Sequence, residues 1–258
     1  MFADAFLFEG CPAVQLVKLC RKEVIMKALI RYFSRKEKLL WISSVILIVL
    51  SFCIFDRENY MTLTASLIGV TSLIFNAKGN PLGQFLMVIF SLIYGVISYS
   101  FSYYGEMVTY LGMTMPMAVF ALVEWLRNPY NGNKAEVEVN RISRAECIFM
   151  WVLTVVVTIV FYYILVFFGT ANIVPSTLSV TTSFVAVYLT SRRSAYFAVA
   201  YAANDLILIL LWVLASLQDA RYISVVVCFV AFFVNDVYGF LSWRKMEKRQ
   251  GLILQTEN

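Results

Sequence analysis

The chain has 258 residues, of which 61% are hydrophobic and 14% are charged, with a formal net charge of +5 and no histidine. Soluble domains usually carry about 25% charged residues, so this composition excludes an ordinary soluble domain. The lack of histidine excludes zinc and haem sites built on histidine, and also a serine–histidine–aspartate triad. The five cysteines show no CxxC spacing, so we expect neither a metal nor any other cofactor.

The apolar residues fall in blocks of roughly 17–23 residues, the length that a helix needs to cross a hydrocarbon core about 30 Å thick. No water reaches that core, so each block has to satisfy its own backbone groups, and helix is the expected form. The sequence therefore predicts an all-α polytopic membrane protein with eight transmembrane helices. The predicted spans are 39–55, 60–76, 82–104, 107–126, 147–168, 173–190, 195–217 and 221–241.

Basic residues are distributed unevenly between the two sides that eight spans define. All of them except Arg57 and Arg221 fall on the side that carries both termini. Because lysine and arginine are retained on the cytoplasmic side, we predict that both termini are cytoplasmic. The same placement favours membrane lipid, and not nucleic acid, as the partner of the positive charge. Trp125 and Trp243 lie at predicted cytoplasmic span ends, where an indole can bury its ring and keep its N–H in water.

The spans form two similar triples. Each triple closes with a tryptophan motif, Glu-Trp-Leu-Arg at 124–127 and Ser-Trp-Arg at 242–244, and begins with a span rich in serine and threonine. One extra span between the triples makes the copies parallel, and parallel repeats around a midplane substrate site are a known transporter plan. The predicted parts are a basic cytoplasmic segment 1–38, an extra N-terminal span 39–55, a first triple 60–126, a loop and linker helix 127–168, a second triple 173–243 and a cytoplasmic tail 244–258.

Asp205 is the strongest candidate for a substrate-binding residue, because it lies near the middle of the seventh span. A carboxylate inside the hydrocarbon is costly and usually faces a cavity or a partner. Helical spacing places Tyr201 and Trp212 on the same face, and Asn204 is adjacent. This face suits a flat, polar or cationic small molecule. The alternative is an interhelical hydrogen bond that only fixes packing.

Other polar residues within the spans are weaker candidates. They are Asn235, Asp236 and Tyr238 in the last span, and Gln84, Ser91 and Tyr94 in the third. Asp236 lies close enough to the interface to pair with Arg244 instead. Ser91 belongs to a stripe of small residues, which normally indicates close helix packing. Glu124 is the one other acidic residue that we place inside a span, and we expect it to be interfacial. Pro116 interrupts the fourth span and predicts a kink there.

Two motifs in the second triple are recognisable. Ser-Arg-Arg at 191–193 leads into Tyr-Phe-Ala-Val-Ala-Tyr-Ala-Ala-Asn-Asp at 196–205, and the triple closes with Asn-Asp-Val-Tyr-Gly-Phe-Leu-Ser-Trp-Arg at 235–244. Through these motifs, residues 60–245 resemble the PnuC family of bacterial vitamin transporters, which is related to the SWEET sugar transporters. The resemblance implies a three-plus-one-plus-three core in the bacterial cell membrane and uptake of nicotinamide riboside without energy coupling.

The chain departs from the family pattern in its seventh span. That pattern has two tryptophans three residues apart and an asparagine four residues later, whereas Ala198, Tyr201 and Asp205 occupy these places here. A carboxylate would favour a cation, such as nicotinamide riboside or thiamine. A deoxynucleoside and riboflavin also stay open as substrates.

The residues and the resemblance together predict a facilitator that moves nicotinamide riboside by alternating access of the two triples. The sequence has no Walker motif and no paired catalytic constellation, so we expect neither an ATP-driven pump nor an enzyme. A membrane receptor or assembly subunit that binds a ligand without moving it is the second hypothesis. The sequence leaves the oligomeric state open, a homo-oligomer included.

Overall fold

The computed structural model describes residues 31–100, 104–170 and 172–256. Most of the predicted basic segment 1–38 lies outside these ranges. The chain divides into two compact units, with the boundary between Ile42 and Ser43.

Helix α2 (Arg35–Phe55) begins in the first unit and continues into the second. A capping box fixes its start, because the Glu37 N–H donates to Ser34 Oγ and the Ser34 N–H donates to Glu37 Oε2. The helix therefore begins earlier than the predicted span at 39, which followed the apolar residues alone.

The second unit holds the other helices and one small hairpin. They are α3 (Tyr60–Asn76), α4 (Pro81–Ser100), α5 (Tyr104–Thr109), the π-helical η1 (Tyr110–Thr114), α6 (Met115–Arg127), β1 (Pro129–Tyr130), β2 (Asn133–Val137), α7 (Arg144–Phe167), α8 (Ile173–Ser191), α9 (Phe197–Ser216), the 3-10 turn η2 (Ala220–Tyr222) and α10 (Ile223–Thr256). Within the described ranges, seven helical segments are long and apolar enough to cross a membrane, and α3 is a shorter apolar helix of 17 residues. The predicted all-α polytopic membrane class is confirmed.

Helix α10 runs far past the end of the predicted span at 241 and takes in most of the predicted tail 244–258. No proline or glycine interrupts the charged stretch after Trp243 until Gly251, so the helix can continue into water. Glu247 supports this extension by pairing with Arg244, one turn earlier on the same helix face.

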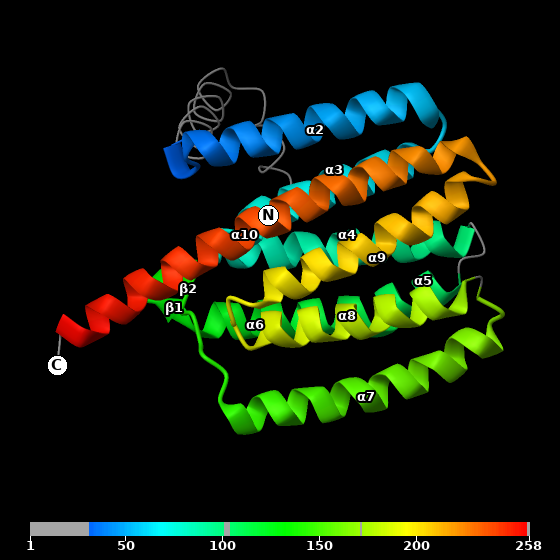
Figure 1. Ribbon diagram of the computed structural model, residues 1–258. Helices are drawn as coiled ribbons and strands as arrows, with labels where there is room; N and C mark the ends of the chain where they lie inside the picture. Colours follow the sequence, from blue (N-terminus) through cyan, green and yellow to red (C-terminus); the bar gives the residue numbers. More distant parts are fainter. Residues whose placement is uncertain (1–30, 101–103, 171, 257–258) are drawn as a thin grey trace, which may run out of the picture. The chain divides into compact units, whose positions relative to one another are not determined.

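The six helices of the two triples pack around a shared core (Figure 1). Helix α4 contacts both α3 and α6, and α9 contacts both α8 and α10. The triples meet where α3 contacts α10 and where α6 contacts α8. Both joints pair the third helix of one triple with the first helix of the other. Helix α7 contacts α8 and α5, and most of its surface stays exposed outside this group.

Trp125 and Trp243 occupy matching places in the two triples. Both are fully buried, and their ring centroids lie 5.4 Å apart. Trp125 Nε1 donates to the Thr190 carbonyl at 2.9 Å, and Trp243 Nε1 donates to the Asn76 carbonyl at 2.7 Å. Each indole thus satisfies a carbonyl at the end of the first helix of the other triple. The prediction that these two N–H groups remain in water is wrong.

The hairpin β1–β2 and the residues after it tie several helix ends together. The Val137 N–H donates to the Gly79 carbonyl at 2.9 Å, just beyond α3, and the Asn140 N–H donates to the Arg193 carbonyl at 3.0 Å, just beyond α8. Gln250 of α10 donates to the Val137 carbonyl at 3.2 Å. Val137 is fully buried in the same cluster as the paired indoles. The sequence predicted only a loop here.

Candidate functional site

Two carboxyl groups interact between α9 and α10, and we call Asp205 and Asp236 the acidic pair. Each residue is only 4% exposed, and Asp205 Oδ2 is buried without a hydrogen-bond partner. No lysine or arginine occurs in residues 197–220 or 222–243, and the nearest one on these two helices is Arg244, eight residues after Asp236. Two carboxyl groups that meet away from water resist carrying two negative charges, and a bound cation or proton relieves that repulsion.

Asn204 joins α8 to α9. Its Oδ1 accepts hydrogen bonds from the hydroxyls of Ser179 at 3.2 Å, Thr182 at 2.9 Å and Ser183 at 3.0 Å. Three of the six serine and threonine hydroxyls between residues 176 and 183 therefore serve this contact. The amide oxygen of Asn204 is therefore engaged in helix packing, which was the alternative predicted for Asp205.

The remaining candidates of the second triple have different surroundings. Tyr201, half-buried on α9, interacts electrostatically with both of its carboxyl groups. Asn235 is buried and donates through Nδ2 to Ser44 Oγ at 2.9 Å and to the Ala231 carbonyl at 2.8 Å. Its Oδ1 is buried without a partner. Tyr238 is half-buried on α10. Tyr201 thus joins the acidic pair, and Asn235 adds an acceptor next to it in sequence.

The candidates of the first triple divide into two kinds. Gln84 Nε2 donates to Asn76 Oδ1 at 2.8 Å, which links α4 to the end of α3 and engages this side chain in packing. Ser91 is fully buried, and its Oγ has no hydrogen-bond partner. Tyr94 lies in the main hydrophobic core with its ring centroid 4.4 Å from that of Tyr110. Ser91 and Tyr94 therefore remain candidates for ligand contact, whereas Gln84 has a structural role.

The break in the fourth span takes the form of the π-helical segment η1, which ends two residues before Pro116. Proline has no N–H to donate, and π-helical turns are frequent at functional sites. Gly95 allows η1 to lie close to α4, because a Cβ at this position would be 2.5 Å from Leu111 Cδ2. The segment carries Tyr110 into the core, where its side chain interacts with Asp205.

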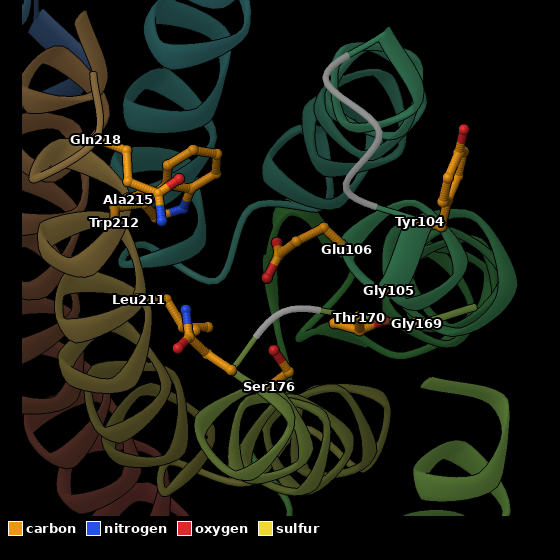
Figure 2. Close-up of a pocket in the computed structure, with 11 residues that line it drawn as sticks. Tyr104, Gly105, Glu106, Gly169, Thr170, Ser176, Leu211, Trp212, Ala215 and Gln218 are labelled. Atoms are coloured by element: carbon orange, nitrogen blue, oxygen red, sulfur yellow. The ribbon is translucent and has the colours of Figure 1, made fainter. Parts of the chain in front are cut away.

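A cavity of about 180 Å³ opens at the end of the bundle where α5 and α8 begin and α9 ends. It is lined by Tyr104, Gly105, Glu106, Gly169, Thr170, Asn172, Ser176, Leu211, Trp212, Ala215 and Gln218. Figure 2 shows the Glu106 side chain pointing from α5 into the space between α5 and α9. Glu106 Oε2 and Thr170 Oγ1 are both buried without a hydrogen-bond partner. We call this cavity the Glu106 pocket.

Sequence reasoning missed Glu106, because the predicted fourth span began at 107 and left this residue in a link. The helix in fact begins at Tyr104. The spacing of Glu106 and Tyr110, one helical turn apart, was the available signal. Tyr110 interacts electrostatically with both Glu106 and Asp205. Tyr110 is therefore within electrostatic range of both the Glu106 pocket and the acidic pair.

A surface ion pair lies near the same end of the bundle. Arg221 donates to Asp219 at 2.7 Å, and this contact lowers the pKa of the Asp219 carboxyl below its ordinary value. Arg221 is one of the two basic residues that the predicted topology places outside. Its charge is engaged by Asp219, and it does not line the Glu106 pocket.

Comparisons with known proteins identify the family and the fold. Residues 59–245 match the family model described as nicotinamide mononucleotide transporter. A nicotinamide riboside transporter PnuC of Neisseria mucosa is 25% identical over 201 residues, which cover 76% of each chain. The protein of that name from Haemophilus influenzae is 21% identical over 216 residues, covering 82% of this chain and 91% of the relative. A crystal structure of the vitamin B3 transporter PnuC shares the fold, with a TM-score of 0.74 and 22% identity over 84% of this chain and 94% of that chain.

The family model spans well over half of the chain, and both relatives and the solved structure carry the PnuC name. The resemblance seen in the sequence motifs is confirmed. The chain belongs to the nicotinamide mononucleotide transporter family.

Proposed function

We propose that this protein carries nicotinamide riboside across the bacterial cell membrane by facilitated diffusion. Family membership makes it a transporter of a small molecule, and two relatives are named for this substrate. The observation that carries the proposal is the acidic pair, buried on helices without lysine or arginine beside it. Nicotinamide riboside carries a positive charge on its pyridinium ring, and two opposed carboxyl groups attract such a charge.

Other candidate residues offer groups that match the remaining parts of this substrate. Tyr201 offers an aromatic face for stacking on the pyridinium ring. Asn235 Oδ1 and Ser91 Oγ, both buried without partners, supply hydrogen-bonding groups for the carboxamide or the ribose hydroxyls. The substrate would then satisfy polar atoms that the protein leaves unsatisfied.

Alternating access between the two triples is the mechanism that we infer. The Glu106 pocket is open at one end of the bundle, while the buried indoles of Trp125 and Trp243 and the side chain of Val137 fill the opposite end. With both termini in the cytoplasm, as the basic residues predict, the pocket faces outward and the indole end faces inward. Rocking of the triples about their two joints would exchange these states.

Ligand binding to the purified protein tests the site. We expect nicotinamide riboside to bind, and Asp205→Asn to weaken its binding by about tenfold to hundredfold, because a charge-assisted contact becomes a neutral one. Tyr201→Ala should weaken binding through lost stacking. Glu124→Gln removes an acidic group in the last turn of α6, where we expect it to be interfacial. It is the matched control and should bind like the parent.

The same titrations with thiamine, riboflavin and a deoxynucleoside decide the substrate class. Asp205→Asn should weaken the binding of a cationic substrate much more than the binding of a neutral one. Unchanged binding in folded Asp205→Asn and Tyr201→Ala protein would remove the acidic pair from the site. Tighter binding of riboflavin or a deoxynucleoside than of nicotinamide riboside would overturn the proposed substrate.

A further inference from the structure

We propose that the Glu106 pocket is a second binding site, which captures a planar aromatic cation before it reaches the acidic pair. This inference rests on the proposed function for the identity of the substrate, but not for the existence of the site. The pocket lies at the predicted external end of the bundle, and its lining comes from three elements: α5, the start of α8 with the residues before it, and the end of α9.

The chemistry of the lining favours a cation. Glu106 is the one charged residue among those that line the pocket, and its Oε2 is buried without a hydrogen-bond partner. A buried carboxyl group without a partner is costly, so a ligand that supplies positive charge gains from binding there. Of the two basic residues at the predicted outer end, Arg221 is paired with Asp219 and Arg57 donates to the Cys53 carbonyl, and neither lines the pocket.

The pocket also offers an aromatic wall and further polar groups. Trp212 lines it from α9, and indole is the ring that attracts cations most strongly. Thr170 Oγ1 is buried without a partner, and the exposed Gln218 borders the same space (Figure 2). A pyridinium ring with a carboxamide substituent would find charge, a stacking surface and hydrogen-bond partners together. A volume of about 180 Å³ is below the range of roughly 300–1,000 Å³ that is usual for drug-sized ligands, and so favours a single ring over a whole nucleoside.

Contacts along the core connect this pocket with the central site. Tyr94 packs edge-on against Trp212, with ring centroids 6.5 Å apart, and against Tyr110 at 4.4 Å. Tyr110 interacts in turn with Glu106 and with Asp205. A cation that leaves the pocket thus meets aromatic faces first and the acidic pair next.

Protection of a cysteine placed in the pocket tests this site directly. In a background without the native cysteines, Gln218→Cys is treated with a maleimide in detergent. Nicotinamide methylated on its ring nitrogen is the cationic probe, and unmethylated nicotinamide is the neutral control. We expect the cation to slow labelling and the neutral compound to have little effect.

Three further substitutions in the same background separate the two sites. Glu106→Gln should raise the concentration for half protection by about tenfold to hundredfold, while Glu124→Gln leaves it unchanged. Asp205→Asn should keep the protection, because the cation still binds at the pocket. An unchanged labelling rate without ligand shows that each variant keeps the parent structure around position 218. If Glu106→Gln alters that rate, Thr170→Val provides the second test and should weaken protection.

Protection that survives Glu106→Gln and disappears in Asp205→Asn would overturn the inference, because the cation would then act from the central site. Equal protection by the neutral compound would also overturn it. A failure of nicotinamide riboside transport by the parent protein would instead reject the proposed function and leave the labelling result intact.

Discussion

Replacement of Asn204 by alanine should lower the stability of the second triple more than it disturbs ligand binding. Asn204 Oδ1 accepts from three hydroxyls of α8. Thr182 also donates to the Leu178 carbonyl at 2.9 Å, so it keeps an acceptor in Asn204→Ala. In this variant Ser179 and Ser183 lose the acceptor that Asn204 provides. Interhelical hydrogen bonds in membranes are worth about 0.6 kcal/mol on average and about 1.7 at most, so two give roughly 1–3 kcal/mol.

Unfolding in mixed micelles with increasing denaturing detergent measures this loss. Asn204→Asp keeps an acceptor for the same hydroxyls and is the matched control, which should retain more stability than Asn204→Ala. The folded fraction of Asn204→Ala should still bind nicotinamide riboside with an affinity close to that of the parent. Full stability together with a large loss of binding would refute the structural role and return Asn204 to the substrate site.

Three other experiments test the packing and the topology. Gly95→Ala should destabilise by about 1–3 kcal/mol through overpacking, since its Cβ would lie 2.5 Å from Leu111, and an added Leu111→Ala should recover part of the loss in the same unfolding assay. Trp243→Phe removes the N–H that caps a helix end, and we expect faster maleimide labelling of cysteines near the end of the bundle that holds Trp125 and Trp243; an unchanged rate would argue against a closed end held by this indole. In intact cells and a cysteine-free background, Asp219→Cys should react with an impermeant maleimide, and Glu136→Cys only after permeabilisation; the reverse pattern would invert the proposed topology.

The helices could be predicted because a hydrocarbon core demands long apolar segments, and each predicted span does contain a helix. Their ends were predicted less well, since other forces set them. The capping box of Ser34 and Glu37 starts α2 earlier than its apolar residues suggest. Helix α10 continues into charged residues that hydropathy excludes, and η1 replaces the simple kink expected at Pro116.

Asp205 stood out in the sequence because a single carboxylate in an apolar run is conspicuous. Its interaction with Asp236 depends on how α9 and α10 are rotated against each other, which hydropathy does not determine. The same limit applies to Trp125 and Trp243, whose bonds to Thr190 and Asn76 cross from one triple to the other. An indole at the end of a span has the same sequence signature whether it faces lipid headgroups or a buried carbonyl.

Glu106 shows a third kind of limit. The predicted spans left it in the short link between them, and only the tertiary structure turns its side chain toward α9 (Figure 2). The roles of Gln84 and Asn204 became clear in the same way, through the partners that engage them. Polar residues within membrane helices can be found from sequence. Whether such a residue packs helices or binds a ligand can be judged only when its hydrogen-bond partners in the structure are known.

Uptake of labelled nicotinamide riboside into proteoliposomes that contain only this protein distinguishes facilitated diffusion from binding alone. We expect saturable, protein-dependent uptake that stops when the inside and outside concentrations are equal, is unchanged by a protonophore, and is strongly reduced in Asp205→Asn. Binding without any uptake would instead identify a receptor, and accumulation above the outside concentration that a protonophore abolishes would contradict facilitated diffusion.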